Sequence, residues 1–170
     1  PEDRSHDGYI GGFSVRENLV LERYRNDEFS HGLRLDLDAI EKNAASRIEE
    51  FDIRTEGMEA PVGSLSGGNQ QKVVVARQFS RPLKVLIASQ PTRGVDVGSI
   101  EFIHKRIIRE RDQGTAVFIN STALAEIYAL ADRIAVMYDG RIVGTVTPDI
   151  AREQIGLMMA GAHDPEEVSA

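Results

Sequence analysis

Apolar residues recur at helical spacing through the first half of the chain. Behind Asp38 they fall three or four positions apart, which predicts a helix with one apolar face made by Ile40, Ala44, Ile48 and Phe51. Ser14 precedes another such run and Glu17 follows it three positions later, an arrangement typical of a capping box at a helix start. The first half of the chain is therefore expected to be helical.

A third helix is predicted within the sequence SLSGGNQQK. Ser66 is a residue type that favours the N-cap position, and the helical pattern continues to about Ser80, where Pro82 ends it. The stretch before this helix, residues 52–64, predicts a loop because it contains Gly57, Pro61 and Gly63.

From Leu83 onward the pattern changes to alternating strands and helices. Short runs rich in valine and isoleucine at residues 83–88, 115–120 and 133–138 each predict a strand that is buried on both faces. Between the first two runs, a helix ending near Gly114 is predicted by an apolar stripe of Ile100, Ile103, Ile107 and Ile108.

The end of the chain continues this alternation. Residues 123–131 predict a further helix, and Asp139-Gly140 predicts a hairpin turn after the third strand. A last helix is predicted to begin at Thr147-Pro148-Asp149. The fold class expected from this order is α/β, with a mostly parallel sheet and its helices preceded by an α-helical segment.

Composition narrows the class of protein. The 170 residues are 41% hydrophobic and 28% charged, which is typical of a soluble globular domain. No apolar run reaches the roughly 18 residues of a membrane span, and no secretory signal pattern is present. The chain has no cysteine, and its four histidines lack the spacing of metal ligands. A formal net charge of −7 argues against a nucleic-acid partner.

The glycines after Ser66 carry the first chemical hypothesis. A helix start presents backbone N–H groups without intrahelical partners and the positive end of the helix dipole, so it suits an anion such as phosphate. Glycine at Gly67 and Gly68 would let the backbone approach that anion closely. For the sequence Ser-Gly-Gly alone, an ordinary serine-capped helix is the favoured interpretation.

Four motifs that follow one another in the sequence favour the anion-binding interpretation instead. LSGGNQQK resembles the signature motif of ATP-binding cassette (ABC) ATPases, and VLIASQPTRGVD occupies the place of the Walker B strand and D-loop. The sequence from FINSTALAE to GRIVG is similar to the switch region and the strands after it. Together with PEDR and ENLVL near the start, the resemblance covers about residues 1–146 and is to the second cassette of importers for simple sugars or nucleosides.

The resemblance implies a function shared between two cassettes. ATP with Mg²⁺ would lie between the Walker A loop of one cassette and the signature of the other, and cassette closure would drive transmembrane permease subunits at the cytoplasmic face of the cell membrane. An extracytoplasmic solute-binding protein would be an indirect partner. The residues of this chain that would contact the partner cassette's nucleotide are Leu65, Ser66, Gly67, Gly68, Asn69, Gln70 and Asp96.

Three positions depart from the family pattern, and one motif is missing. Ser89 stands where the family has the Mg²⁺-supporting aspartate, Gln90 where it has the catalytic glutamate, and Thr122 where it has the switch histidine. This cassette's own nucleotide site is therefore expected to be degenerate. The chain also has no Gly-x-x-x-x-Gly-Lys-Ser/Thr loop, which the family places before PEDR. A truncated cassette would be inactive alone, with an exposed sheet edge.

The expected organisation has three segments. Residues 1–82 would hold the Q-loop remnant and the helical subdomain with the signature, residues 83–146 the C-terminal part of the nucleotide-binding core, and residues 147–170 a helix and tail. Within the first segment, Glu2, Asp3 and Arg4 are either coupling residues or a solvated turn.

The sequence also allows two other functions. A non-transport ABC module acting on ribosomes or DNA usually needs basic surfaces, but this chain has 27 acidic and 20 basic residues. A nucleotide-sensing regulatory half-domain is the other alternative. The signature argues against a purely structural role.

Overall fold

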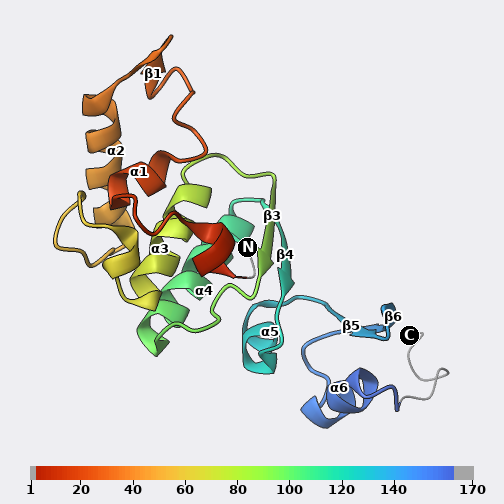
Figure 1. The fold of residues 1–170 in the computed structure, drawn as a ribbon. Helices are drawn as coiled ribbons and strands as arrows, with labels where there is room; N and C mark the ends of the chain where they lie inside the picture. The colour runs from red at the N-terminus through yellow and green to blue at the C-terminus, as the bar shows by residue number, and fades with distance from the viewer. Residues whose placement is uncertain (1–2, 163–170) are drawn as a thin grey trace. The chain divides into compact units, whose positions relative to one another are not determined.

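The computed structural model describes residues 3–162 and divides into two compact units, Pro1–Asn120 and Ser121–Ala170. The expected segment boundary at residue 82 does not coincide with this division, because the first parallel strands belong to the same unit as the helices before them. In chain order, the first unit contains η1 (Arg4–Gly8), α1 (Val15–Val20), β1 (Ser30–His31), β2 (Arg34–Leu35), α2 (Leu37–Glu50), η2 (Val62–Ser64), α3 (Gly67–Gln78), β3 (Val85–Ser89), α4 (Val97–Asp112) and β4 (Ala116–Asn120) (Figure 1). The second unit contains α5 (Leu124–Leu130), β5 (Ile134–Tyr138), β6 (Arg141–Val146) and α6 (Arg152–Met159).

The predicted capping box at the start of α1 is confirmed. The Glu17 carboxylate accepts the Ser14 backbone N–H at 2.7 Å, and the Ser14 hydroxyl accepts the Glu17 backbone N–H at 3.3 Å. These hydrogen bonds lower the pKa of Glu17. The second helix starts slightly earlier than expected, since Asp36 rather than Asp38 supplies its N-cap.

Helices α1, α2 and α3 pack together around an aliphatic core (Figure 1). Full burial of one valine, leucine, isoleucine or phenylalanine side chain contributes about 1.5–3 kcal/mol to the free energy of folding. Phe51, at the end of α2, meets Phe102 of α4 edge to face, with ring centroids 6.1 Å apart. The largest apolar side chains with almost no exposure in this unit are Phe29, Phe51, Leu19, Ile103, Val15, Val62 and Val73.

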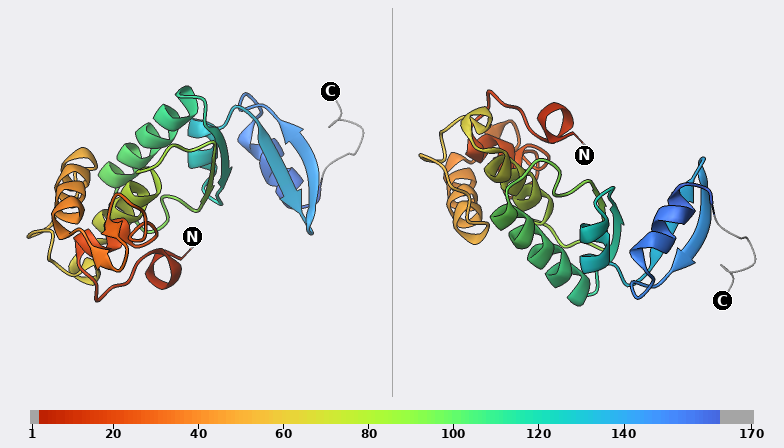
Figure 2. Two further views of the ribbon diagram at one scale, coloured as in Figure 1. Left: turned by 90° about the horizontal axis from the view of Figure 1, so that it is seen from above. Right: turned by 90° about the horizontal axis from the view of Figure 1, so that it is seen from below.

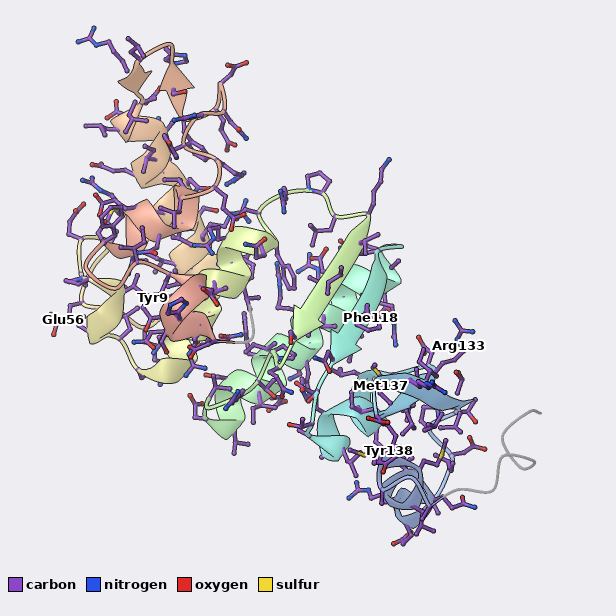
Figure 3. All side chains as sticks on the ribbon, turned by 45° about the vertical axis from the view of Figure 1, so that its right-hand side comes forward. Tyr9, Glu56, Phe118, Arg133, Met137 and Tyr138 are labelled. Atoms are coloured by element: carbon purple, nitrogen blue, oxygen red, sulfur yellow. The ribbon has the colours of Figure 1, made fainter. Side chains whose placement is uncertain are left out.

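Strands β3 and β4 form a parallel pair joined through α4. Their register runs from Val85 opposite Ala116 to Ser89 opposite Asn120, so both strands end at the same edge. The expectation of burial on both faces is wrong for these described residues, since the Ile87 side chain is 73% exposed and the Phe118 side chain is 60% exposed. Figure 3 shows the Phe118 side chain on β4. The physical reason is that helices cover one face of this pair, while the outer face carries these side chains into solvent.

The second unit is a hairpin with a helix against it (Figure 2). The predicted turn at Asp139-Gly140 is confirmed, since both residues have positive φ angles, 46° and 73°, as a two-residue hairpin turn requires. Strands β5 and β6 are antiparallel, and a small core unites them with α6. Its buried members are Ile134, Val136, Ile155 and Met158.

The predicted start of the last helix is wrong. Helix α6 begins at Arg152, and the Thr147 hydroxyl instead donates to the Asp149 carboxylate within a turn. The Ile150 N–H closes that turn on the Thr147 carbonyl at 3.2 Å. Local side-chain bonding of this kind competes with helix formation, so a capping sequence can end in a turn rather than start a helix.

Candidate functional site

The candidate site is the start of α3, which the sequence SLSGGNQQK forms as predicted. Ser66 is the N-cap, with extended backbone angles of −61° and 154°. Its hydroxyl oxygen accepts the Asn69 side-chain amide at 3.0 Å and, more weakly, the Asn69 backbone N–H at 3.5 Å. Ser66 is exposed, and a hydroxyl that accepts these two bonds can still donate its own hydrogen to a further acceptor.

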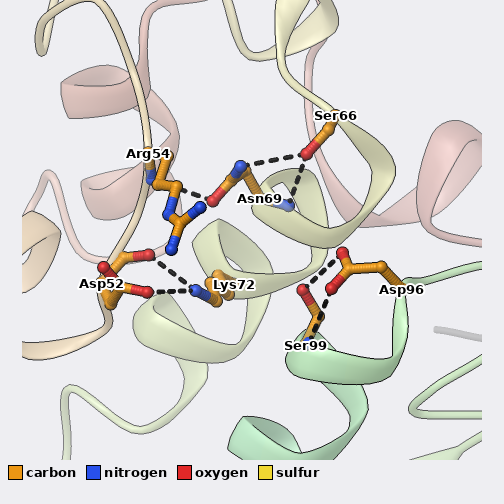
Figure 4. A network of polar contacts seen from close by, with 7 residues as sticks. All are labelled: Asp52, Arg54, Ser66, Asn69, Lys72, Asp96 and Ser99. Carbon is orange, nitrogen blue, oxygen red and sulfur yellow. Dashed lines mark hydrogen bonds and ion pairs between the residues drawn. The ribbon is translucent and has the colours of Figure 1, made fainter.

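The side chains that follow Ser66 are held by the surrounding loop. The side-chain Oδ1 atom of Asn69 accepts the Arg54 backbone N–H at 2.9 Å (Figure 4). The Gln70 amide turns back and donates to the Leu65 carbonyl at 3.0 Å. Asn69 and Gln70, both expected near a nucleotide, thus fix the shape of the loop that leads into α3.

The two signature glycines make room for other parts of this chain. A Cβ on Gly68 would lie 2.3 Å from both the Asp96 carboxylate and the Ser99 hydroxyl. A Cβ on Gly67 would lie 2.7 Å from the Arg4 guanidinium and 3.0 Å from the Gly94 carbonyl oxygen. The contacts below 3.0 Å are shorter than real Cβ atoms make, so a side chain at Gly68 would have to displace Asp96 and Ser99, and one at Gly67 would have to displace the end of the Arg4 side chain. The sequence predicts that glycine at these positions allows an anion to approach closely. Packing against other residues of the same chain is a second reason why glycine is needed there.

Asp96 is the last residue of the D-loop, residues 91–96, which lies between β3 and α4. It is the N-cap of α4: its carboxylate accepts the Ser99 backbone N–H at 2.9 Å and the Ser99 hydroxyl at 2.8 Å (Figure 4). The bond from the Ser99 N–H is the main cause that lowers the pKa of Asp96. The amide of Gln71, from α3, donates to the Pro91 carbonyl at 2.7 Å. The signature helix and D-loop are therefore directly bonded.

Lys72 fixes the other side of α3. Its ammonium group donates to the Asp52 carbonyl at 2.7 Å and to the Asp52 carboxylate at 2.9 Å, and it lies 5.0 Å from the centre of the Phe102 ring. The hydrogen bond and charge of Lys72 lower the pKa of Asp52 below its ordinary value of 3.8. The Lys72 side chain is nearly buried, whereas the Asp52 side chain is 63% exposed.

This ion pair gives a pH prediction. Because the folded-state pKa of Asp52 is lowered, its contribution to stability is present above pH 3.8 and is lost as the pH falls through the lowered value. We expect the stability advantage of wild type over Asp52→Asn to be larger at pH 7 than at pH 3. Asparagine suits the test, because Asp52 has a φ of 47° and asparagine tolerates that conformation. Thermal unfolding of both proteins at the two pH values measures it; an advantage that is equal at both would contradict the prediction.

The carboxyl end of β3 carries two of the altered family positions. The Ser89 hydroxyl accepts the Asn120 side-chain amide at 3.3 Å, and the Gln90 N–H donates to the Asn120 carbonyl at 2.7 Å. Gln90 has a φ of 49°, an unusual conformation for a residue other than glycine. Mg²⁺ in proteins usually needs one or two carboxylates. Ser89, Gln90 and Asn120 supply none, so this donor set does not fit the ion.

Thr122, the third altered position, belongs to the second unit. It lies in the turn between β4 and α5, where the Ala123 N–H donates to the Ser121 hydroxyl at 3.1 Å. Ser89 and Gln90 therefore belong to the first unit and Thr122 to the second.

Arg4 and Arg77 join residues near the start of the chain to this site. Arg4 donates to the carbonyls of Arg93 and Gly94 in the D-loop. Arg77, deeply buried on α3, donates to the Gly8 carbonyl at 2.7 Å. The sequence leaves two roles open for Arg4, a coupling residue or part of a solvated turn. Its hydrogen bonds to carbonyls 89 and 90 residues away show that its side chain is not a free solvated one. Pro1 and Glu2 of the same motif lie outside the described residues.

The fold of the described residues is that of part of an ABC cassette. The dimeric structure of MJ0796, a bacterial ABC transporter cassette, matches with a TM-score of 0.69 at 19% identity, covering 88% of this chain and 62% of that chain. A post-hydrolysis state of the same cassette bound to ADP and Pi matches with a TM-score of 0.64 at 20% identity, over 84% of this chain and 60% of that chain. The expected α/β fold class is confirmed.

Sequence comparison finds import ATP-binding proteins. The nucleoside import ATP-binding protein NupA of Lactococcus lactis is 46% identical over 96% of this chain and 32% of that protein. The guanosine import protein NupO of Bacillus subtilis is 44% identical over 98% and 33%. The glucose import protein TsgD13 of Haloferax volcanii is 45% identical over 96% and 30%. The chain thus spans about a third of the length of these relatives. No family model matches the sequence.

Among residues 3–162, no helix combines the length and apolar character needed to cross a lipid bilayer. Within the same range, no three histidine, aspartate or glutamate side chains lie close enough together to hold a metal ion.

Proposed function

We propose that this chain is part of the ATP-binding subunit of an ABC importer, which couples ATP binding and hydrolysis to uptake of a simple sugar or nucleoside. The observation that carries the proposal is the bonded unit of signature and D-loop. Ser66 caps α3 with an exposed hydroxyl, and Gly68 packs on Asp96 and Ser99. Similarity to nucleoside and glucose import ATP-binding proteins supports the same function.

The signature would act on ATP held by a partner cassette, most simply another part of the same longer protein. ATP supplies the phosphoanhydride bond that is cleaved. The exposed Ser66 hydroxyl would donate to a γ-phosphate oxygen, and the first N–H groups of α3, at Gly67 and Gly68, would add the positive end of the helix dipole. Asp96 would hold the D-loop at the same interface through its cap on α4.

The site completed by this chain's own core would be silent or slow. Ser89 has no charge with which to support Mg²⁺, and the amide of Gln90 is not a useful base near neutral pH. Thr122 cannot act as the switch histidine. Without a Walker A loop, the 170-residue chain alone would not turn over ATP.

The same proposal places the assembled protein at the cytoplasmic face of the cell membrane. Its partners would be transmembrane permease subunits and, indirectly, an extracytoplasmic solute-binding protein, with no nucleic acid. Hydrolysis at one of two sites would suffice to separate the cassettes and reset the permease.

The asymmetry is tested at Gln90 in the full-length parent protein reconstituted with its permease. We expect Gln90→Asn to keep ATP turnover within about twofold of wild type, because a silent site contributes little to kcat. Asparagine tolerates the φ of 49° at this position, so the backbone is not strained further. Steady-state ATP turnover measures the effect, with Ser66→Arg as the inactive reference. A tenfold loss in Gln90→Asn would show that this site works.

A further inference from the structure

Arg4 lies where three separate segments of the first unit meet. Its guanidinium donates through Nη1 to the Arg93 carbonyl at 2.5 Å and through Nη2 to the Gly94 carbonyl at 2.9 Å. The same Nη2 atom is 2.7 Å from the place a Cβ would take on Gly67. A side chain at residue 67 would therefore displace the guanidinium from its present place. One side chain thus contacts both the D-loop and the first residue of the signature helix.

The turn that carries Arg4 is itself fixed at both ends. At its start, the Asp3 carboxylate accepts the Ser5 N–H at 2.8 Å and the His6 N–H at 3.4 Å. At its end, the Gly8 carbonyl accepts the buried guanidinium of Arg77 at 2.7 Å. Arg77 belongs to α3, so η1 is bonded to the signature helix at its end and to the D-loop through Arg4. A displacement of η1 would move both.

The geometry of the two acceptors requires an arginine. Backbone carbonyls of consecutive residues are held by two N–H groups in a fixed fork, whereas a lysine ammonium is a single point donor on a flexible chain. Gly94 has a φ of 67°, a conformation that few residues other than glycine adopt. A charged donor to neutral carbonyls also forms a stronger hydrogen bond than a neutral donor would.

We propose that Arg4 is a positioning residue that holds the D-loop carbonyls against the start of the signature helix, and so sets the geometry in which Ser66 meets ATP. This inference rests on the proposed function, since it assigns Arg4 to the same site. It also makes η1 the element through which a movement at the start of this chain reaches the signature and the D-loop together.

The test uses the full-length parent protein reconstituted with its permease. Arg4→Ala is expected to lower kcat for ATP about 10- to 100-fold, as expected for a misplaced catalytic group. Arg4→Lys is expected to lie between wild type and Arg4→Ala. The matched control is Arg34→Ala, an exposed arginine on β2 of the same unit, which is expected to match wild type.

Amide hydrogen exchange distinguishes a local positioning role of Arg4 from a general loss of stability in the first unit. In Arg4→Ala, amides of residues 91–96 are expected to exchange faster while those of α2 keep their protection. Faster exchange throughout the unit would overturn the proposal, because the role would then be structural. Unchanged turnover in Arg4→Ala, with Ser66→Arg inactive, would overturn it and leave the proposed function standing. Unchanged turnover in both variants would overturn this inference and, with it, the assignment of the signature to the productive ATP site.

Discussion

Full-length parent protein carrying Ser66→Arg, reconstituted with its permease, is expected to lose ATP turnover by about 100-fold or more, the range seen when a preorganised donor to a reacting oxygen is removed. Ser66 is exposed at the N-cap of α3, so an arginine there has room in the isolated fold. In the assembled pair of cassettes, its long side chain would occupy the space that the partner's γ-phosphate needs. The hydroxyl that caps the helix would be lost as well.

The contribution of the cap can be separated from that of the nucleotide contact. Loss of a serine N-cap costs about 1 kcal/mol of stability, too little to unfold most domains. Ser66→Arg should therefore fold. Ser46→Arg is the matched control, because Ser46 is exposed on α2 and arginine is a good helix former. Equal turnover in wild type and Ser66→Arg would mean that hydrolysis does not use this signature, and that the active and silent sites are the reverse of those proposed.

The second large effect is expected at Gly68. An alanine Cβ there would lie 2.3 Å from the Asp96 carboxylate and the Ser99 hydroxyl, and Ser99 is buried. Relief of the clash must break the contact between Asp96 and Ser99 or shift α3 from α4. Overpacking of this kind costs about 1–3 kcal/mol. Since the D-loop moves with these residues, turnover of the full-length protein should fall together with stability.

Gly98→Ala is a closely matched control for Gly68→Ala. Gly68 and Gly98 are both the second residue of their helices, α3 and α4, so the gain in helix propensity on replacing glycine, up to about 1 kcal/mol, applies to both. The Cβ at Gly98 would meet only Asp96, at an ordinary 3.4 Å. Urea unfolding of the 170-residue variants should place Gly68→Ala about 1–3 kcal/mol below Gly98→Ala, which is the overpacking cost alone. Equal stabilities would show that the α3–α4 contact accommodates a methyl group.

The two glycines also change how the signature motif is understood in this chain. A glycine in such a motif is usually explained by the ligand that comes close to its backbone. Here Gly67 and Gly68 are already required by Arg4, Gly94, Asp96 and Ser99 of the same chain. Substitution at either glycine therefore tests folding and nucleotide contact at once, whereas Ser66→Arg tests mainly the contact, because the lost cap costs only about 1 kcal/mol.

Features set within one or two turns of chain were predictable from the sequence. The capping box of Ser14 and Glu17, the N-cap of α3 at Ser66 and the hairpin turn at Asp139-Gly140 all follow the prediction. Each is formed by atoms two or three residues apart, so residue type and spacing are enough to specify it. The order of motifs also identified the ABC fold correctly. The start of α6 was missed because a local turn at Thr147 competed with the helix.

Contacts between distant segments were decided only by the tertiary structure. The sequence places Arg4 89 residues before the D-loop carbonyl that it binds, and nothing in residue type or spacing indicates that pairing. The exposure of Ile87 and Phe118 was likewise not predictable from the sequence, because an apolar run has the same pattern whether one face of the strand or both faces are covered. Local hydrogen bonds are determined by the geometry of a few successive residues. Long-range contacts depend on the path of the whole chain, which the packing of α3, α4 and η1 fixes.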